Sequence, residues 1–317
     1  MVRAANVRFS PTKIDFAFPD NGKINGRVNV LPAMRAARAN RFGALVVLMM
    51  SGLLASAVLF AQGRFWGGGQ IYVPPGTRTA RELGTRSVGT PMWENPRGYE
   101  TEVFTFARLR YDAAPRPITA RRGGWATDLP DADLNLSYRL QQLTALRVDP
   151  NARLIRATDP DLSEYPFLFA SAPGAMGLTP EEVIGLRNYL LNGGFLLMTD
   201  YWGDADLAHV ERLFLEILPQ FRFEELPIEH PLYRMVVNIR EKAQVPNIHV
   251  GLKIPNTQIH HRVIFDAKGR LIVMGLHNSD DSDGWEREGE NFEYFEKYAE
   301  KIAYPLAINI IFYIMTH

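Results

Sequence analysis

The distribution of apolar positions along residues 100–317 predicts strands and helices in alternation. Short apolar or β-rich runs predict strands, because a strand covered on both faces has no polar side. Longer segments with apolar residues three and four positions apart predict helices, because these positions share one helix face. The predicted strands are 103–109, 167–170, 195–198, 262–265 and 270–276, and the predicted helices are 131–146, 180–192, 204–218 and 291–313, the last with a break at Pro305.

Local signals support the helix that begins at Pro180. Thr179 can cap it, Pro180 suits the first helical position, and Glu182 can close a capping box. The helix is predicted to end near Gly193, because glycine adopts the left-handed backbone that ends many helices. Strands and helices that alternate in this way predict an α/β fold with a mainly parallel sheet and helices on both faces.

Residues 42–63 contain no charged side chain. About 20 apolar residues, at ~1.5 Å each, are enough to cross a bilayer core of roughly 30 Å. Three arginines between residues 35 and 41 precede this run, so residues 64–317 are expected outside the cytoplasm. The length favours an uncleaved anchor in a bacterial inner membrane. The small residues at 55–57 favour instead a cleaved signal that releases the domain to the periplasm.

The rest of the chain divides around this apolar run. Residues 1–41 are either a short cytoplasmic segment or, in part, untranslated, because Met34 could begin a conventional signal or anchor sequence. Residues 64–99 are rich in glycine, proline and arginine and are interpreted as a linker. Residues 100–317 are interpreted as the folded domain.

Composition excludes several classes of function. The formal net charge is +0 and no basic stripe is visible, so nucleic acid is not an expected partner. The chain contains no cysteine, which excludes disulfides, thiol nucleophiles and cysteine metal ligands. The expected partners are the membrane, through residues 42–63, and an envelope protein.

Candidate binding residues follow the predicted strands, because ligands of an open α/β sheet gather beyond the carboxyl ends of its strands. Asp128 and Asp131 precede a predicted helix, where they could cap it or accept hydrogen bonds from sugar hydroxyls or bind a hard cation. The candidate ligand-binding residues are Arg108, Arg110, Asp128, Asp131, Ser171, Gly174, Tyr201, Trp202 and Asn278.

Several long segments resemble one bacterial family. FTFARLRYD (104–112), DLPDADLNLSYRLQQLT (128–144), YLLNGGFLLMTDYWGDAD (189–206), HNSDDSDGWEREGE (277–290) and EKIAYPLAINIIFYIMTH (300–317) are similar to the family catalogued as domain of unknown function 4159. That family is grouped with the class I glutamine-amidotransferase-like fold. The resemblance therefore implies a flavodoxin-like αβα sandwich over about residues 100–317, and it implies no established activity.

The amidotransferase analogy can be examined at the positions that would carry the chemistry. True amidotransferases place a cysteine nucleophile on an elbow after a strand, and this chain has Asp200 or Tyr201 there. Glutaminase chemistry is therefore not expected. Asp200 could be a nucleophile or general base, or it could only end a strand and cap the next helix. His277, just beyond another strand, is the best general-base candidate among the histidines.

Residues 279–290 partly match a calcium-binding loop. Asp281, Asp283 and Glu290 fall at positions 3, 5 and 12, but Ser279 stands at position 1. These three acids are weak metal candidates, and the preferred interpretation is an acidic surface loop that Trp285 anchors and in which Glu286 pairs with Arg287. No metal or cofactor is therefore predicted.

Two functions of different classes remain open on the sequence. The preferred hypothesis is a membrane-tethered, extracytoplasmic domain with a binding or scaffolding role in the cell envelope. The alternative is an envelope hydrolase that uses Asp200 with His277, with carbohydrate as its substrate. The two differ in geometry, because the hydrolase needs the carboxylate and the imidazole within hydrogen-bond reach of each other.

Overall fold

The computed structural model describes residues 71–98, 103–113 and 124–317. The predicted membrane segment, 42–63, and the segment before it lie outside these ranges. None of the helices in the described ranges combines the length and the apolar character that crossing a membrane requires.

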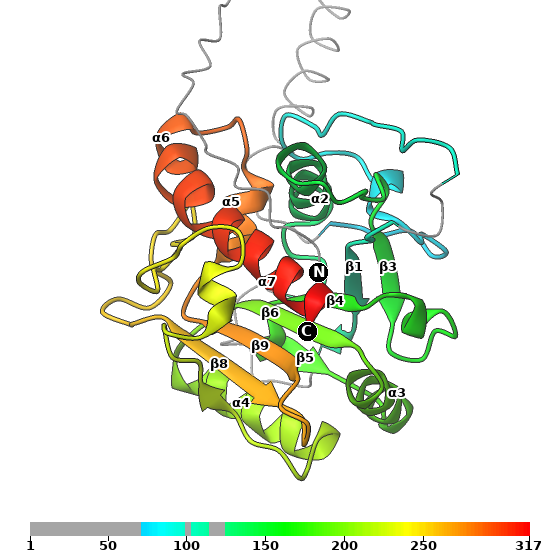
Figure 1. The fold of residues 1–317 in the computed structure, drawn as a ribbon, viewed down its shortest axis with the longest axis vertical. Helices are drawn as coiled ribbons and strands as arrows, with labels where there is room; N and C mark the ends of the chain where they lie inside the picture. The colour runs from blue at the N-terminus through cyan, green and yellow to red at the C-terminus, as the bar shows by residue number, and fades with distance from the viewer. Residues whose placement is uncertain (1–70, 99–102, 114–123) are drawn as a thin grey trace, which may run out of the picture. The chain divides into compact units, whose positions relative to one another are not determined.

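A seven-stranded sheet forms the centre of the fold (Figure 1). Its spatial order is β3-β1-β4-β6-β9-β8-β7, and the neighbours from β3 to β9 are parallel, whereas β8 and β7 are antiparallel additions at one edge. The strands are β1 (Ala107–Arg110), β3 (Arg153–Arg156), β4 (Phe167–Ser171), β6 (Phe195–Tyr201), β7 (Glu224–Glu225), β8 (His260–Phe265) and β9 (Leu271–His277). The predicted α/β class with a mainly parallel sheet is confirmed.

The order of the five parallel strands is informative about ligand binding. Taken in chain order they lie 2-1-3-4-5, which is the order of flavodoxin-like sheets. In such sheets ligands bind at the carboxyl ends of the strands, beside the point where the strand order reverses. Here that point lies between β1 and β4, so β1, β4, β6 and β9 bring their carboxyl ends to the edge of interest.

Helices cover both faces of the sheet (Figure 1). Packing on one face are α2 (Asp131–Leu143), α5 (Asp281–Glu286) and α7 (Tyr304–Thr316), and packing on the other are α3 (Pro180–Leu191) and α4 (Gly203–Ile217). The remaining elements are α6 (Phe292–Tyr294), a π-helical stretch at Phe295–Ala303, a two-stranded sheet of β2 (Asp112–Ala113) with β5 (Met176–Gly177), and four short 3₁₀ helices.

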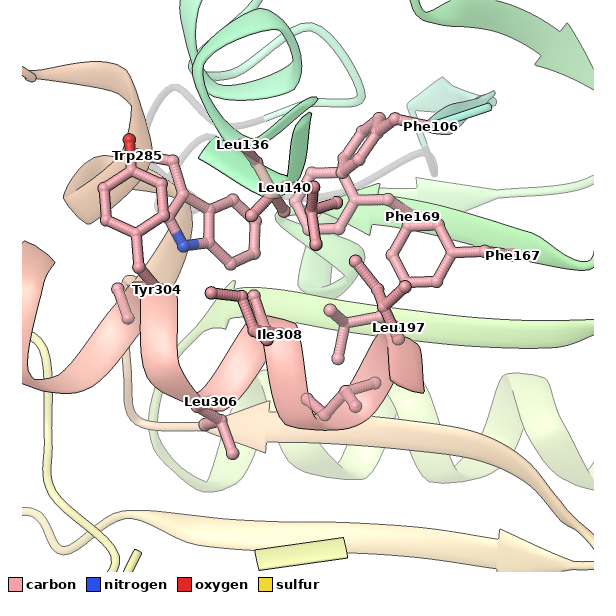
Figure 2. Close-up of a cluster of buried hydrophobic side chains, with 14 of the residues drawn as sticks. Phe106, Leu136, Leu140, Phe167, Phe169, Leu197, Trp285, Tyr304, Leu306 and Ile308 are labelled. Carbon is pink, nitrogen blue, oxygen red and sulfur yellow. The ribbon is translucent and has the colours of Figure 1, made fainter. Parts of the chain in front are cut away.

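Alternation along the strands divides the core into two halves, because successive strand side chains point to opposite faces. Phe167 and Phe169 of β4 pack on the side of α2 and α7, and Leu168 and Ala170 pack on the side of α3 and α4. Figure 2 shows the first of these cores, in which Trp285 of α5 lies beside side chains of α2 and α7. The Trp285 ring meets the Phe169 ring edge-on at 5.6 Å, which ties α5 to the sheet.

The local signals around α3 act as predicted. The Thr179 side chain accepts a hydrogen bond from the backbone N–H of Glu182, and the Glu182 carboxylate accepts one from the backbone N–H of Thr179. Gly193, with φ 120°, follows the helix and turns the chain into β6.

Two predicted elements differ from the structure. The strand predicted at 103–109 is shorter, because Phe104 pairs only in an isolated bridge with Val148 and β1 begins at Ala107. The break predicted at Pro305 does not occur. Pro305 lies in the first turn of α7, where a missing N–H costs little, and the preceding residues continue the helix in π-helical form.

Candidate functional site

Unusual backbone conformations gather at the carboxyl edge of the sheet. Ala172 after β4, Asp200 at the end of β6, Asn278 after β9 and Asp128 before α2 all have φ between 50° and 63°. A non-glycine residue in this region carries a cost of roughly 1–2 kcal/mol, which aspartate and asparagine reduce with local hydrogen bonds. Four strained residues at one edge indicate that side chains are being aimed there.

Hydrogen bonds between these turns hold the strained backbone in place. The N–H of Ala172 donates to the carbonyl of Thr199 (3.0 Å), and the N–H of Asp200 donates to the carbonyl of Ser279 (2.9 Å). Asn278 donates in turn to the carbonyl of Tyr201 (2.9 Å). The ends of β4, β6 and β9 are thereby joined into one rigid rim.

The side chains at this rim form a buried group of acids, here called the acidic centre. Its members are Asp128, Asp200, Asp280, Asp283 and Glu286, each 7% exposed or less. They come from the loop before α2, the end of β6, and the turn and helix after β9. Buried carboxylates are costly unless they are paired or bind a cation, so this concentration requires a physical explanation.

One lysine from a distant loop enters the acidic centre. The ammonium of Lys253 contacts the carboxylates of Asp200 and Asp280, the second at 3.1 Å. Although burial lowers the pKa of Lys253, the contacts with Asp280 and Asp200 raise it overall, so the side chain stays charged. The segment before it is fixed to the same centre, since the N–H of Ile248 donates to Asp283 at 2.6 Å.

Three members of the acidic centre are arranged as ligands of one ion would be. Asp128, Asp283 and Glu286 each place a carboxylate oxygen within 4.8 Å of those of the other two. Asp283 and Glu286 lie three positions apart on α5, which puts both on one helix face. Asp128 reaches them from the loop before α2.

Mutual repulsion and burial together change the acidity of this group. Burial is the largest cause that raises the pKa of Asp128 to about 6 and the pKa of Glu286 to about 8, and neighbouring carboxylates add to it. The pKa of Asp200 and of Asp283 is raised well above the usual range, by burial first and then by Asp280. The acidic centre therefore holds protons or a cation at neutral pH.

Arg108, a predicted binding residue, lies beside Asp128 but has a partner of its own. Its Nε donates to both oxygens of Asp133 at 2.9 Å, and its Nη1 donates to the carbonyls of Trp125 and Thr127. The Nη2 of this fully buried side chain has no hydrogen-bond partner among the described residues. Its electrostatic effect on Asp128 shows that the guanidinium lies close to the acidic centre.

The two residues of the hydrolase hypothesis lie at the same rim but do not pair. Asp200 contacts Lys253 and accepts a hydrogen bond from the Trp202 indole at 3.0 Å. The His277 Nε2 lies 3.1 Å from the carbonyl of Gly203, and no hydrogen bond joins Asp200 to His277 in the described residues. Burial is the largest of the causes that lower the pKa of His277.

The loop expected to carry an oxyanion hole is occupied by protein groups. Carbonyls of Ser171 and Ala172 accept hydrogen bonds from the Tyr111 hydroxyl, at 2.6 and 2.9 Å. A Cβ at Gly174 would lie 2.4 Å from the Cγ of Asp206, so that carboxylate covers the glycine. The Ser171 hydroxyl is buried and has no partner within the described ranges.

The remaining predicted binding residues are held by neighbours in the fold. Asp131 binds the Thr85 hydroxyl and the N–H of Arg86, and the Arg110 guanidinium lies 5.0 Å from the Trp125 ring centroid. The Asn278 side chain links the N–H of Gly203 to the carbonyl of Gln258. Tyr201 is buried, with its ring 5.0 Å from that of His277.

The interpretation of residues 279–290 as an acidic surface loop is wrong. Residues Asp281–Glu286 form the buried helix α5, and this conformation is not that of an extended calcium-binding loop. Asp281 accepts a hydrogen bond from Ser279, and Glu290 is exposed and pairs with Arg287. Asp283 alone of the three weak metal candidates belongs to the acidic centre. Trp285 is anchored and Glu286 contacts Arg287, both as predicted.

Sequence reasoning missed Asp280, Glu286 and Lys253 as site residues. The spacing of Asp283 and Glu286 could have indicated a shared helix face, had α5 been predicted. Lys253 follows no strand and belongs to no motif, so only the folded loop brings it to Asp200 and Asp280.

Comparison with known proteins agrees with the resemblance in the sequence. No curated protein matches the chain. The profile of a family described as a domain of unknown function, DUF4159, matches residues 105–315, which include every strand of the seven-stranded sheet and all of the acidic centre. The chain therefore belongs to the DUF4159 family.

Proposed function

We propose that this protein is a ligand-binding domain of the bacterial cell envelope, with the acidic centre as its binding site. The observation that supports a binding role is the imbalance of charge at the rim. Five buried carboxylates face two cationic side chains, Lys253 and Arg287. A ligand that carries positive charge or several hydroxyl donors would stabilise this arrangement, because buried carboxylates need such partners.

The membrane tether is part of the same proposal. The uncharged run at 42–63 and the arginines before it support an inner-membrane anchor with residues 64–317 outside the cytoplasm. A cleaved signal would release the same domain to the periplasm. In either case the binding site is presented to the envelope, where an envelope protein is the proposed partner of a scaffolding role.

The proposal includes descent from the class I glutamine-amidotransferase-like superfamily without its chemistry. The flavodoxin-like strand order and the strained residue at the end of β6 are compatible with that superfamily. Asp200 stands at the elbow in place of a thiol, and its carboxylate is engaged by Lys253 and Trp202. A carboxylate held in this way is a binding group and a poor nucleophile.

Binding can be tested on the full-length protein in mild detergent by thermal unfolding with named probes. The probes are Mg²⁺, Ca²⁺, spermidine and N-acetylglucosamine, which represent hard cations, polyamines and sugars. We expect at least one probe to raise the unfolding temperature of the wild type. The same probe should have a smaller effect on Asp200→Asn or Asp283→Asn, because each substitution removes a charge from the acidic centre.

A glutaminase assay tests the other half of the proposal. The full-length protein should release no ammonia from glutamine above the buffer background, because a thiolate nucleophile is missing. A catalytically active amidotransferase in the same detergent is the control. Release of ammonia that Asp200→Asn abolishes would contradict the binding role, and so would the absence of any thermal shift with all four probes.

A further inference from the structure

We infer that Asp128, Asp283 and Glu286 bind one divalent cation that prefers oxygen ligands, such as Ca²⁺, Mn²⁺ or Mg²⁺. The inference rests on the proposed binding function and names the class of ligand. Two oxygens that bind one ion cannot be farther apart than twice the metal–oxygen distance. For distances of 2.3–2.6 Å that limit is about 4.6–5.2 Å. The three carboxylate oxygens lie within 4.8 Å of one another, so a single ion can contact all of them without a rearrangement of the backbone.

The three carboxylates have unused capacity to bind a cation. Asp128 accepts a hydrogen bond from the Ser282 hydroxyl, and Asp283 accepts one from the N–H of Ile248. The Glu286 carboxylate accepts no hydrogen bond from the described residues, and its charged contact is Arg287, with Nε 2.7 Å from Oε2. A buried carboxylate usually accepts several hydrogen bonds, so these oxygens are better explained as ligands.

Lys253 does not neutralise this triad. Its ammonium contacts Asp200 and Asp280, the other two members of the acidic centre. The centre is thus divided into two parts. One part is closed by a lysine of the chain itself, and the other has three carboxylates with a single arginine at its side.

A second observation, independent of the acids, also points to a ligand. The Nη2 of Arg108 is fully buried and has no hydrogen-bond partner among the described residues. Since its Nη1 donates to the carbonyl of Thr127, the guanidinium lies next to Asp128. The charge of Arg108 is already balanced by Asp133. Its free N–H therefore calls for a neutral or anionic oxygen, which a water or other oxygen bound to the ion would supply.

The fold holds the three acids in place without an ion. Asp128 is oriented by its left-handed backbone, with φ 63°, and α5 is pressed against the π-helical stretch behind it. A Cβ at Gly284 would lie 2.7 Å from the Cβ of Ala303, so only glycine permits this approach. A preformed site loses little conformational entropy when it binds its ion.

The experiment measures Mn²⁺ binding to the full-length protein in mild detergent, after treatment with a chelator and its removal. The electron paramagnetic resonance signal of free Mn²⁺ reports the bound fraction, and Ca²⁺ and Mg²⁺ are added as competitors. We expect about one Mn²⁺ per chain, with a dissociation constant below about 1 mM, the weak limit for extracellular calcium modules. Glu286→Gln and Asp128→Asn should each weaken binding about tenfold or more, because each removes a ligand charge.

Glu290→Gln is the matched control. Glu290 is an exposed acid four residues after Glu286, and it pairs with Arg287, so its substitution should leave Mn²⁺ affinity within about twofold. Both test substitutions keep the size of the side chain and remove a buried charge. Without metal they should therefore unfold at or above the temperature of the wild type, and if one variant fails to fold the other decides.

Two results would overturn the inference. One is a wild-type protein that retains no Mn²⁺ at about 1 mM, the weak end of the expected range. The other is a folded Glu286→Gln or Asp128→Asn variant that binds Mn²⁺ as tightly as the wild type. Thermal shifts with spermidine or N-acetylglucosamine in the absence of Mn²⁺ binding would leave the proposed binding function standing and remove only the cation site.

Discussion

At the residue scale, buried polar side chains differ in how the fold satisfies them. Arg108 and Asp133 are both inaccessible and form a two-pronged ion pair, with additional hydrogen bonds to backbone carbonyls. His261 is equally buried, and its Nδ1 lies 2.6 Å from the Tyr233 hydroxyl, while its Nε2 has no partner in the described residues. Burial, followed by the charges of Lys242 and His260, lowers the pKa of His261 to about 3. The imidazole is therefore neutral in the folded protein.

His261 should make the protein sensitive to moderately acidic pH. The unfolded chain binds a proton below about pH 6.5, whereas the folded chain does not until about pH 3, so stability is lost as the pH falls between these values. Between pH 7 and pH 5 this group should remove about 2 kcal/mol of unfolding free energy. Urea unfolding of the wild type and His261→Gln at both pH values measures the difference. An equal loss of stability in the two proteins would show that His261 is not the cause.

At the element scale, glycines decide how closely two elements approach. Gly185 lies in the interior of α3, where glycine is usually about 1 kcal/mol less favourable than alanine. A Cβ at this position would lie 2.0 Å from the carbonyl oxygen of Ala157, after β3. The close approach of α3 to the end of β3 therefore outweighs helix propensity at this position.

Gly185→Ala should destabilise the protein although it raises helix propensity. The clash with backbone costs about 1–3 kcal/mol, which exceeds the gain of about 1 kcal/mol in the helix. Gly84→Ala is the matched control, because a Cβ there meets nothing within 4 Å and no positive φ is involved. Denaturant unfolding should show a lower midpoint for Gly185→Ala and an unchanged one for Gly84→Ala. A stabilised Gly185→Ala protein would contradict the proposed contact.

At the scale of the whole molecule, the position of the site follows from topology. The parallel strands bring Ser171, Asp200 and Asn278 to one edge, and the loop before α2 adds Asp128 at the same edge. The opposite edge carries an open hollow of about 620 Å³, lined by residues such as Asn192, Asp266 and Arg270. Arg270 there is already bound to Asp266 and to the carbonyl of Gly194, so this hollow lacks the uncompensated charge of the acidic centre.

The orientation in the membrane is the remaining prediction for the whole molecule. Alkaline phosphatase fused after residue 100 should be active, and β-galactosidase fused at the same point should be inactive, because the arginines at 35–41 keep the preceding segment in the cytoplasm. Fusions after residue 38, before the apolar run, serve as the control and should give the reverse pattern. Activity of β-galactosidase at residue 100 would place the acidic centre in the cytoplasm.

Local patterns in the sequence determined the secondary structure and the class of fold. The capping box at Thr179, the apolar runs of β4 and β6, and the amphipathic α2 and α4 depend on neighbours close in the chain, so their signals are readable before folding. The carboxyl edge was also predictable as the place of the site, because parallel strands align their ends. Asp128 and Asp200 were named for that reason.

Tertiary structure alone decided which of these side chains meet. Lys253 reaches Asp200 across more than fifty positions of sequence, and no local pattern encodes that contact. Residues 281–286 look like a polar loop because Asp281 and Asp283 are charged, yet Trp285 draws them into the core as helix α5. The division of the acids into a lysine-bound part and an open triad depends on distances of a few ångströms. Only the packing of α5 against α2 and the π-helical stretch sets those distances.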